Sequence, residues 1–155
     1  MTKEEILLRP FKPADQDTVK ELILAGLGEH FEQINPIFNP DLNNISESYA
    51  DALFIVAQDA ERIIGTGALV QRGPDCGEIV RMSVASDKRR HGIGTQILRQ
   101  LCDEGRARGY TQIILETTAT WTEVIEFYKR FGFRITHEVE GEYGRELYFA
   151  LELTQ

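Results

Sequence analysis

The segment Val84–Thr95 has the residue types and spacing of a phosphate-binding loop. An apolar strand ends at its start and a helical pattern begins at its end. The first N–H groups of a helix lack intrahelical partners and carry a partial positive charge. Gly92 and Gly94 let a ligand approach the backbone, while Arg89 and Arg90 add charge and bidentate donors. The segment therefore predicts a binding site for a pyrophosphate group.

Two other phosphate-binding motifs do not match this sequence. The P-loop string GxxxxGK[ST] is absent. The dinucleotide fingerprint GxGxxG requires a third glycine at position 97, but this position is Ile97, on the apolar face of the helix. We therefore expect the loop to bind a different phosphate-containing ligand.

The charge distribution favours a local anion site over a polyanion-binding surface. The 155 residues include 17 Lys and Arg against 25 Asp and Glu, and the net charge of −8 argues against nucleic-acid binding. Residues 81–110 nevertheless hold seven bases and three acids, although chance clustering on a solvated face would explain this equally well. The two cysteines and three histidines are scattered, so we expect neither a disulfide nor a metal site.

Hydrophobic periodicity predicts the elements that must position this loop. Short apolar runs between turn residues predict strands, and apolar residues every three to four positions predict helices. Strands that meander and then alternate with helices predict the α/β class, with one mixed sheet and helices on both faces, in a single domain of residues 1–155. The expected strands are 6–8, 53–57, 63–70, 79–84, 113–115, 133–137 and 147–153, and the expected helices are 13–27, 92–108 and 120–131.

Two further stretches of the sequence accompany the loop. The first lies directly before it, and the second follows it after one helix and one strand. Glu78–Val84 is an apolar strand that ends in valine, and Val124–Phe133 reads VIEFYKRFGF. With the R-x-x-G-x-G of the loop, they resemble the fourth strand and the Q/R-x-x-G-x-G/A and A-I-x-F-Y-x-x-x-G-F signatures of the GNAT superfamily of acetyl-CoA-dependent N-acetyltransferases. The resemblance covers residues 53–153 and implies the GNAT (acyl-CoA N-acyltransferase) fold, with a splay between the fourth and fifth strands.

The resemblance implies an activity and a cofactor site. Family members transfer an acetyl group from acetyl-CoA directly to a primary amine of a small molecule or a protein, without a metal. The resemblance implies that main-chain groups of Arg90–Thr95 hold the CoA pyrophosphate. It also implies that main-chain groups of Met82–Val84 hold the pantetheine arm and the thioester. The implied cofactor-binding residues are Met82, Ser83, Val84, Arg89, Arg90, His91, Gly92, Ile93, Gly94 and Thr95.

The resemblance and the chemistry of the reaction also suggest residues for proton transfer. Tyr128 matches the position that commonly protonates the leaving thiolate, and a core aromatic is the alternative interpretation. Glu78 is the candidate general base, with an exposed strand-edge carboxylate as its alternative; Glu116 or water are other candidates for the base. Trp121 stands where the family often has Asn. This favours a second hypothesis, a CoA-binding sensor or interaction module without transfer activity; a third is the use of another acyl-CoA.

The acceptor side is less visible in the sequence. Residues 29–51 show no regular hydrophobic periodicity, and we expect an acceptor-side loop or short helices there. Acidic residues in the late hairpin would favour a cationic amine, with a solvated surface as the alternative. The acidic N-terminus and the lack of an apolar run long enough to span a membrane indicate a cytoplasmic protein that does not bind membranes, and the family resemblance allows a homodimer. The hairpin acids are Glu138, Glu140, Glu142 and Glu146.

Overall fold

The computed structural model describes residues 6–28, 39–141 and 144–153, whose strands form a mixed sheet. The strands are β1 (Ile6–Pro10), β2 (Leu53–Asp59), β3 (Arg62–Gln71), β4 (Cys76–Val84), β5 (Gln112–Thr118), β6 (Arg134–Gly141) and β7 (Gly144–Glu152). The helices are α1 (Gln16–Gly28), α2 (Ile45–Ser48), α3 (Ile93–Ala107) and α4 (Thr122–Phe131). The strand order is β1-β2-β3-β4-β5-β7-β6, with β4 and β5 parallel, so the predicted mixed α/β sheet is confirmed.

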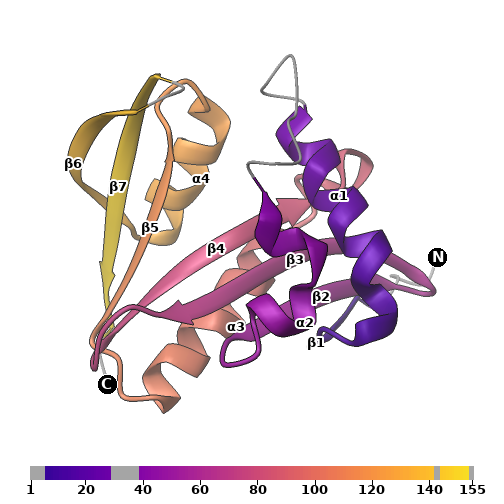
Figure 1. The fold of residues 1–155 in the computed structure, drawn as a ribbon. Helices are drawn as coiled ribbons and strands as arrows, with labels where there is room; N and C mark the ends of the chain where they lie inside the picture. Colours follow the sequence, from indigo (N-terminus) through magenta and orange to yellow (C-terminus); the bar gives the residue numbers. More distant parts are fainter. Residues whose placement is uncertain (1–5, 29–38, 142–143, 154–155) are drawn as a thin grey trace. The chain divides into compact units, whose positions relative to one another are not determined.

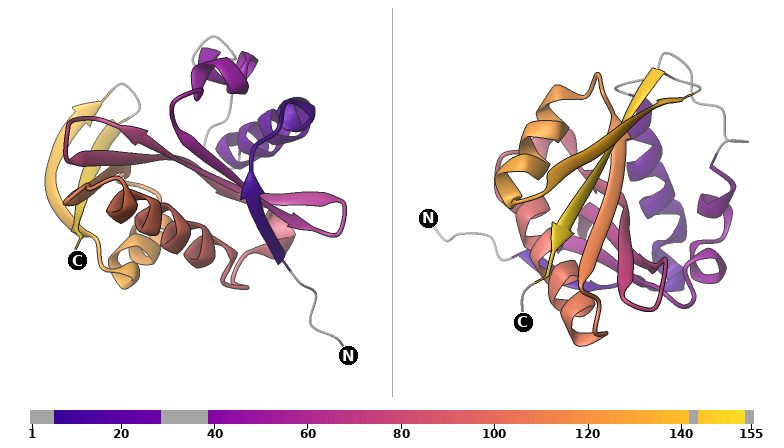
Figure 2. Two further views of the ribbon diagram at one scale, coloured as in Figure 1. Left: turned by 90° about the horizontal axis from the view of Figure 1, so that it is seen from below. Right: turned by 90° about the vertical axis from the view of Figure 1, so that its left-hand side faces the viewer.

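The chain divides into two compact units, and the first comprises residues up to Val70 together with Val80–Leu101. In this unit, α1 and α2 cover one face of the strands and the first part of α3 covers the other (Figure 2). Apolar residues at helical spacing in α1 face alternating residues of β2, which is the periodicity from which both elements were predicted. The buried cluster on the α1 side consists of Val19, Ile23, Leu42, Ile45, Phe54, Val56, Ile63 and Ala68.

Two glycines of β3 allow α3 to pack closely on the sheet. A Cβ atom at Gly67 would lie 2.7 Å from Ile97 Cγ2 and 2.6 Å from Met82 Sδ, which is closer than real side chains approach. At Gly65, the corresponding distance to Ile97 Cδ1 is 3.1 Å. The absence of these side chains therefore fixes the position of α3 and of the Met82 side chain at the end of β4.

The second unit comprises Gln71–Ile79 and the chain from Cys102 onward. Figure 1 shows β5, β7 and β6 side by side, with α4 following β5. Strand alternation gives these strands two faces. The helix-covered face carries buried residues such as Leu115 and Phe149, and Phe149 contacts Tyr128 of α4. We call the opposite face, which carries Glu116 and Tyr148, the polar face; these two residues are directly paired between β5 and β7.

The parallel pairing of β4 with β5 covers three positions, from Cys76 with Gln112 to Glu78 with Ile114. β4 continues to Val84 and β5 to Thr118, so the pairing ends where the predicted splay would begin. At the end of the strand order, β6 has exposed side chains and a bulge between Ile135 and His137.

The order of strands and helices agrees with the prediction, and the region 29–51 is partly resolved into short helices. Residues 29–38 lie outside the described residues. The remainder forms the 3₁₀ helix η3 (Pro40–Asn43) and then α2, so short helices are present where the sequence left a long loop as the alternative. Glu142 also lies outside the described residues. No helix in the described ranges is long and apolar enough to cross a membrane.

Candidate active site

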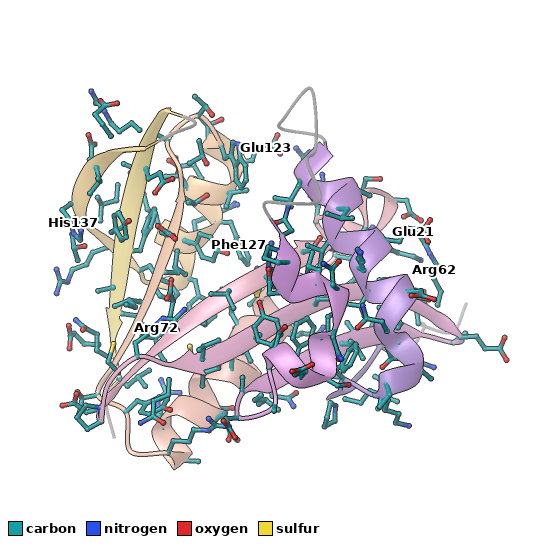
Figure 3. All side chains as sticks on the ribbon, viewed as in Figure 1. Glu21, Arg62, Arg72, Glu123, Phe127 and His137 are labelled. Atoms are coloured by element: carbon teal, nitrogen blue, oxygen red, sulfur yellow. The ribbon has the colours of Figure 1, made fainter. Side chains whose placement is uncertain are left out.

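Ion pairs and left-handed backbone positions hold the loop between β4 and α3 in shape. After the short 3₁₀ helix η4 (Ser86–Lys88), Arg90 and Gly92 adopt φ angles of +67° and +81°. Arg62 of β3, labelled in Figure 3, donates two 2.7 Å hydrogen bonds to the carboxylate of Asp87. These contacts join the loop to the start of β3.

The first turn of α3 begins directly after this loop. Its first residue, Ile93, is 2% exposed and anchors the turn in the core, whereas Gly94 and Thr95 are half-buried. Gln96 N donates to Gly92 O at 3.0 Å, which is the first bond of the helical ladder. The N–H groups of the first turn precede this bond and have no intrahelical acceptor, so the turn has the geometry of an anion cradle.

Two arginines border a small cavity beside the loop. Arg89 Nε donates to Val84 O at 3.1 Å and thereby ties the loop to the end of β4. Arg62 and Arg89 both line a cavity of about 170 Å³ between α1 and the loop. The predicted cofactor-binding residues, from Met82 to Thr95, thus lie together in the first unit. The remaining cavity walls are Leu22, Ala25, Gly26, Val84, Ala85, Ser86 and Asp87.

The predicted base Glu78 lies in the second unit and has a partner that the sequence did not predict. Arg72, labelled in Figure 3, donates a 2.6 Å hydrogen bond from Nε to Glu78 Oε1. The Glu78 side chain is only 15% exposed, so the alternative interpretation as an exposed strand-edge carboxylate does not describe it well. A proton-accepting role for Glu78 must use its second oxygen or displace Arg72.

Glu116, the other base candidate, belongs to a group of polar side chains on the polar face. Tyr148 lies opposite Glu116, and Glu146 lies two residues before Tyr148, on the same face of β7. Burial raises the pKa of Glu146, and the nearby Glu116 carboxylate raises it further. A hydrogen bond to Glu116 raises the pKa of Tyr148. Since Glu78 pairs with Ile114, two residues before Glu116, all these carboxylates share one face.

Tyr128 is buried on the helix-covered face. It is 7% exposed and packs against Phe133 and Phe149 at centroid distances of 5.8 and 5.9 Å. Burial raises the pKa of its phenol, which therefore stays protonated at neutral pH as a proton donor must. The same burial agrees with the alternative interpretation as a core aromatic, because the two interpretations require the same packing.

The acid and base candidates therefore occupy opposite faces of the second unit. Tyr128 contacts Phe149, whereas Glu116 pairs with the adjacent residue Tyr148, and successive residues of a strand point to opposite faces. The sequence pattern alone does not connect Glu146 and Tyr148 with Glu116. The alternation Glu-Leu-Tyr-Phe at 146–149 places the first and third residues on one face, but only the register of β5 with β7 brings that face to Glu116.

Within the described part of the chain, no group of three or more His, Cys, Asp or Glu side chains is arranged to hold a metal ion. The described residues thus combine a mixed sheet that contains a parallel β4–β5 pair with an anion cradle at the start of α3. The chain belongs to the acetyltransferase (GNAT) family, whose model matches residues 19–133.

Three individual proteins show how similar this chain is to known proteins in sequence and fold. N-acetyltransferase 8B of Rattus norvegicus is 29% identical over 111 residues, which is 66% of this chain and 50% of the relative. The chain thus spans about half the length of such curated relatives. An acetyltransferase of the GNAT family from Staphylococcus aureus has a similar fold, with a TM-score of 0.86, 21% identity, and coverage of 97% of this chain and 100% of that one. An aminoglycoside 6'-N-acetyltransferase solved with coenzyme A has a TM-score of 0.74 at 18% identity, with 94% and 96% coverage.

Proposed function

We propose that this chain is an N-acetyltransferase that moves the acetyl group of acetyl-CoA directly to a primary amine of a small molecule or a protein. The observation that carries the proposal is the loop before α3, where first-turn N–H groups without intrahelical acceptors, Arg89 and the left-handed Arg90 and Gly92 have the geometry expected of a pyrophosphate cradle. Membership of the acetyltransferase family supports acetyl-CoA as the donor.

The proposed reaction needs one bond to form and one to break. The amine nitrogen bonds to the acetyl carbon while the carbon–sulfur bond of the thioester breaks. A base on the polar face, Glu78 or Glu116 acting directly or through water, takes the proton from the nitrogen. Tyr128, from the helix-covered face, gives a proton to the departing sulfur.

We further propose a cationic acceptor. The polar face carries the carboxylates of Glu78, Glu116 and Glu146, and the raised pKa of Glu146 reflects its burial and the proximity of like charge. An ammonium group placed there would relieve this repulsion. Cytoplasmic location and homodimer formation stay predictions.

A thiol-release assay with acetyl-CoA and a panel of amines tests the proposed function. We expect free CoA to form only when an amine is added, with one acetylated amine per CoA by mass spectrometry. Calorimetry with CoA runs beside it. Tight CoA binding without thiol release from any amine would support the sensor hypothesis instead, and faster release from propionyl-CoA would show a different acyl donor.

Replacing Arg90 by alanine should weaken CoA binding by about tenfold, because a charged hydrogen bond to phosphate is lost. Arg89→Ala should have a similar effect, with an added loss of loop order because Arg89 also bonds to Val84 O. Calorimetry compares CoA with a phosphate-free pantetheine thioester, whose affinity should change much less. Arg99→Ala, an exposed arginine farther along α3, is the matched control. Equal losses for both ligands would mean that the loop arginines are structural.

Replacing Glu146 by glutamine should raise the Tm at pH 7 by about 1–3 °C. The raised pKa means that folding penalises the charged carboxylate, and this penalty disappears as the pH falls through the folded-state pKa. The difference from wild type should therefore vanish near pH 4. The same variant should raise the KM of a cationic acceptor more than that of a neutral amine.

Glu138→Gln is the matched control on the same hairpin. Glu138 forms a 3.1 Å ion pair with Arg145, so removing its charge should not raise the Tm. A Glu146→Gln variant with the wild-type Tm at both pH values would contradict the repulsion on which the cationic acceptor rests.

A further inference from the structure

Arg81, in the middle of β4, has a backbone conformation that is rare for its residue type. Its φ angle is +56°, in the left-handed region, which costs energy for any residue with a Cβ atom. Val80 packs against the cluster on the α1 side, and the Arg81 side chain points to the same side, toward residues 39–49. Met82 then points to the α3 side, near Gly67. Two successive side chains on one side show that β4 has a bulge at Arg81.

A network of hydrogen bonds from the segment 39–49 holds the Arg81 side chain. Arg81 Nε and Nη2 donate to the two carboxylate oxygens of Asp41 at 2.9 and 2.6 Å, and Nη2 also donates to Asn39 Oδ1 at 3.1 Å. Tyr49 Oη donates to Asp41 Oδ2 at 2.5 Å. Burial acts to raise the pKa of Asp41, but the bonds from Arg81 and Tyr49 outweigh it and lower the pKa. The carboxylate is therefore a permanently charged anchor at neutral pH.

The anchor does not itself depend on Arg81. Leu42 and Ile45, one and four residues after Asp41, are fully buried in the cluster on the α1 side. The Gln16 side chain of α1 donates to Leu42 O at 2.6 Å and accepts from Ile45 N at 2.9 Å. Since these contacts already fix the segment, Asp41 can hold Arg81 in its strained conformation rather than the reverse.

The peptide group after Arg81 is oriented by a second contact. Thr66 of β3, which is fully buried, donates from Oγ1 to Arg81 O at 2.8 Å. The N–H and C=O of a trans peptide point in opposite directions, and the described residues contain no cis peptide. The Met82 N–H therefore points away from β3. Such a donor, fixed before the reaction, is what the developing negative charge on an acyl oxygen requires.

We propose that Arg81 is a positioning residue for acetyl transfer: held by Asp41 and Tyr49, it maintains the β4 bulge that aims the Met82 N–H at the thioester carbonyl. This rests on the proposed function and adds to it, because it gives the segment 39–49 a role in the geometry of the cofactor strand. In this role the three side chains act through the backbone of β4 and not on the reacting atoms.

The first test replaces Asp41 by asparagine, which keeps the shape and removes the charge that holds Arg81. We expect kcat for acetyl transfer to fall by about ten- to a hundredfold, less than the loss of a whole oxyanion donor. The Kd of acetyl-CoA and the acceptor KM should change less than about threefold, since the aimed donor acts mainly in the transition state. Tyr49→Phe, which removes only one bond to the same carboxylate, should fold normally and lower kcat by about two- to fivefold.

A double-mutant cycle checks that the two residues act together. The variant with both Asp41→Asn and Arg81→Ala should lose no more kcat than Arg81→Ala alone, because both changes disrupt one device. Additive losses, or a folded Asp41→Asn variant with wild-type kcat, would overturn the proposal. A loss that follows acetyl-CoA affinity rather than kcat would also overturn it.

A spectroscopic readout separates this proposal from the proposed function. Acetonyl-CoA, a ketone analogue labelled with ¹³C at the carbonyl, reports a hydrogen bond from the Met82 N–H without any transfer. We expect a downfield carbonyl shift on binding to wild type that moves toward the free value in Asp41→Asn. Wild type with this shift but no acetylation of any amine would refute the proposed function and keep the positioning role. An active wild type whose carbonyl shift is the same as that of Asp41→Asn would refute the positioning role and keep the proposed function.

Discussion

Replacing Tyr128 by phenylalanine should lower kcat by about 10²–10⁴-fold while acetyl-CoA affinity stays nearly constant. The change removes one hydroxyl and keeps the ring, so the contacts with Phe133 and Phe149 survive. A hydroxyl that protonates the leaving thiolate acts only in the transition state, so kcat and kcat/KM should fall together. Steady-state kinetics and calorimetry with acetyl-CoA measure these quantities.

The burial of Tyr128 also determines its pH dependence. Burial raises the pKa of the phenol above its ordinary value of 10.0. A raised pKa keeps the donor protonated as the pH increases, so Tyr128 should contribute no basic limb to the kcat profile below about pH 10. A basic limb at lower pH that disappears in Tyr128→Phe would contradict this assignment of the acid.

Tyr110→Phe is the matched control for Tyr128→Phe. Tyr110 is also a buried tyrosine of the second unit, 4% exposed, and the family resemblance gives it no role in the reaction. Its replacement should change kcat less than about threefold. If Tyr128→Phe has near-normal turnover, Tyr128 is a core aromatic and water protonates the thiolate. If it instead loses acetyl-CoA affinity, the hydroxyl serves binding.

Replacing Gly94 by glutamate should weaken CoA binding by on the order of a hundredfold or more, because a carboxylate would stand where we propose that the pyrophosphate is held. The helix should still form. Gly94 is the second residue of α3 and is not among the described glycines with positive φ, and an acid in the first turn of a helix is favourable. Calorimetry with CoA and circular dichroism measure affinity and folding.

Gly94→Ala separates charge from size at this position. The family signature accepts alanine there, so this variant should bind CoA within about threefold of wild type. Gly92 would be a poorer test, because its φ of +81° strains any other residue and a loss of binding could follow from a distorted loop. A folded Gly94→Glu variant with unchanged affinity would show that the pyrophosphate lies elsewhere.

Local patterns in the sequence were sufficient to predict most of the fold, including the loop before α3. The apolar spacing of α3, with Ile93 and Ile97 on one face, reflects burial that any helix in this position needs. The change from strand to helix at Val84–Thr95 is equally local, so both the element order and the loop could be predicted. Tyr128 required more, because its position in a family motif, and not its surroundings, distinguished it from other aromatics.

Contacts between distant segments could not be predicted in this way. The Arg81–Asp41 pair joins residues 40 apart, and the grouping of Glu146 with Glu116 depends on the register of β5 with β7. Periodicity determines which face a residue occupies, but it does not determine which residue of another strand lies beside it. The ion pair of Glu78 with Arg72 is local, since the two residues are only six positions apart, but it depends on how the turn between β3 and β4 folds, which periodicity does not determine either.

The bulge in β6 has a consequence for solubility. β6 ends the strand order, and such an edge can recruit the strand of another molecule and start aggregation. The extra residue between Ile135 and His137 interrupts the regular spacing that a second strand would need, and Glu138 adds negative charge along the edge. A chain in which Thr136 was deleted would present an uninterrupted edge with the exposed Ile135 and Val139, and we would expect it to form fibrous aggregates more readily than the natural chain.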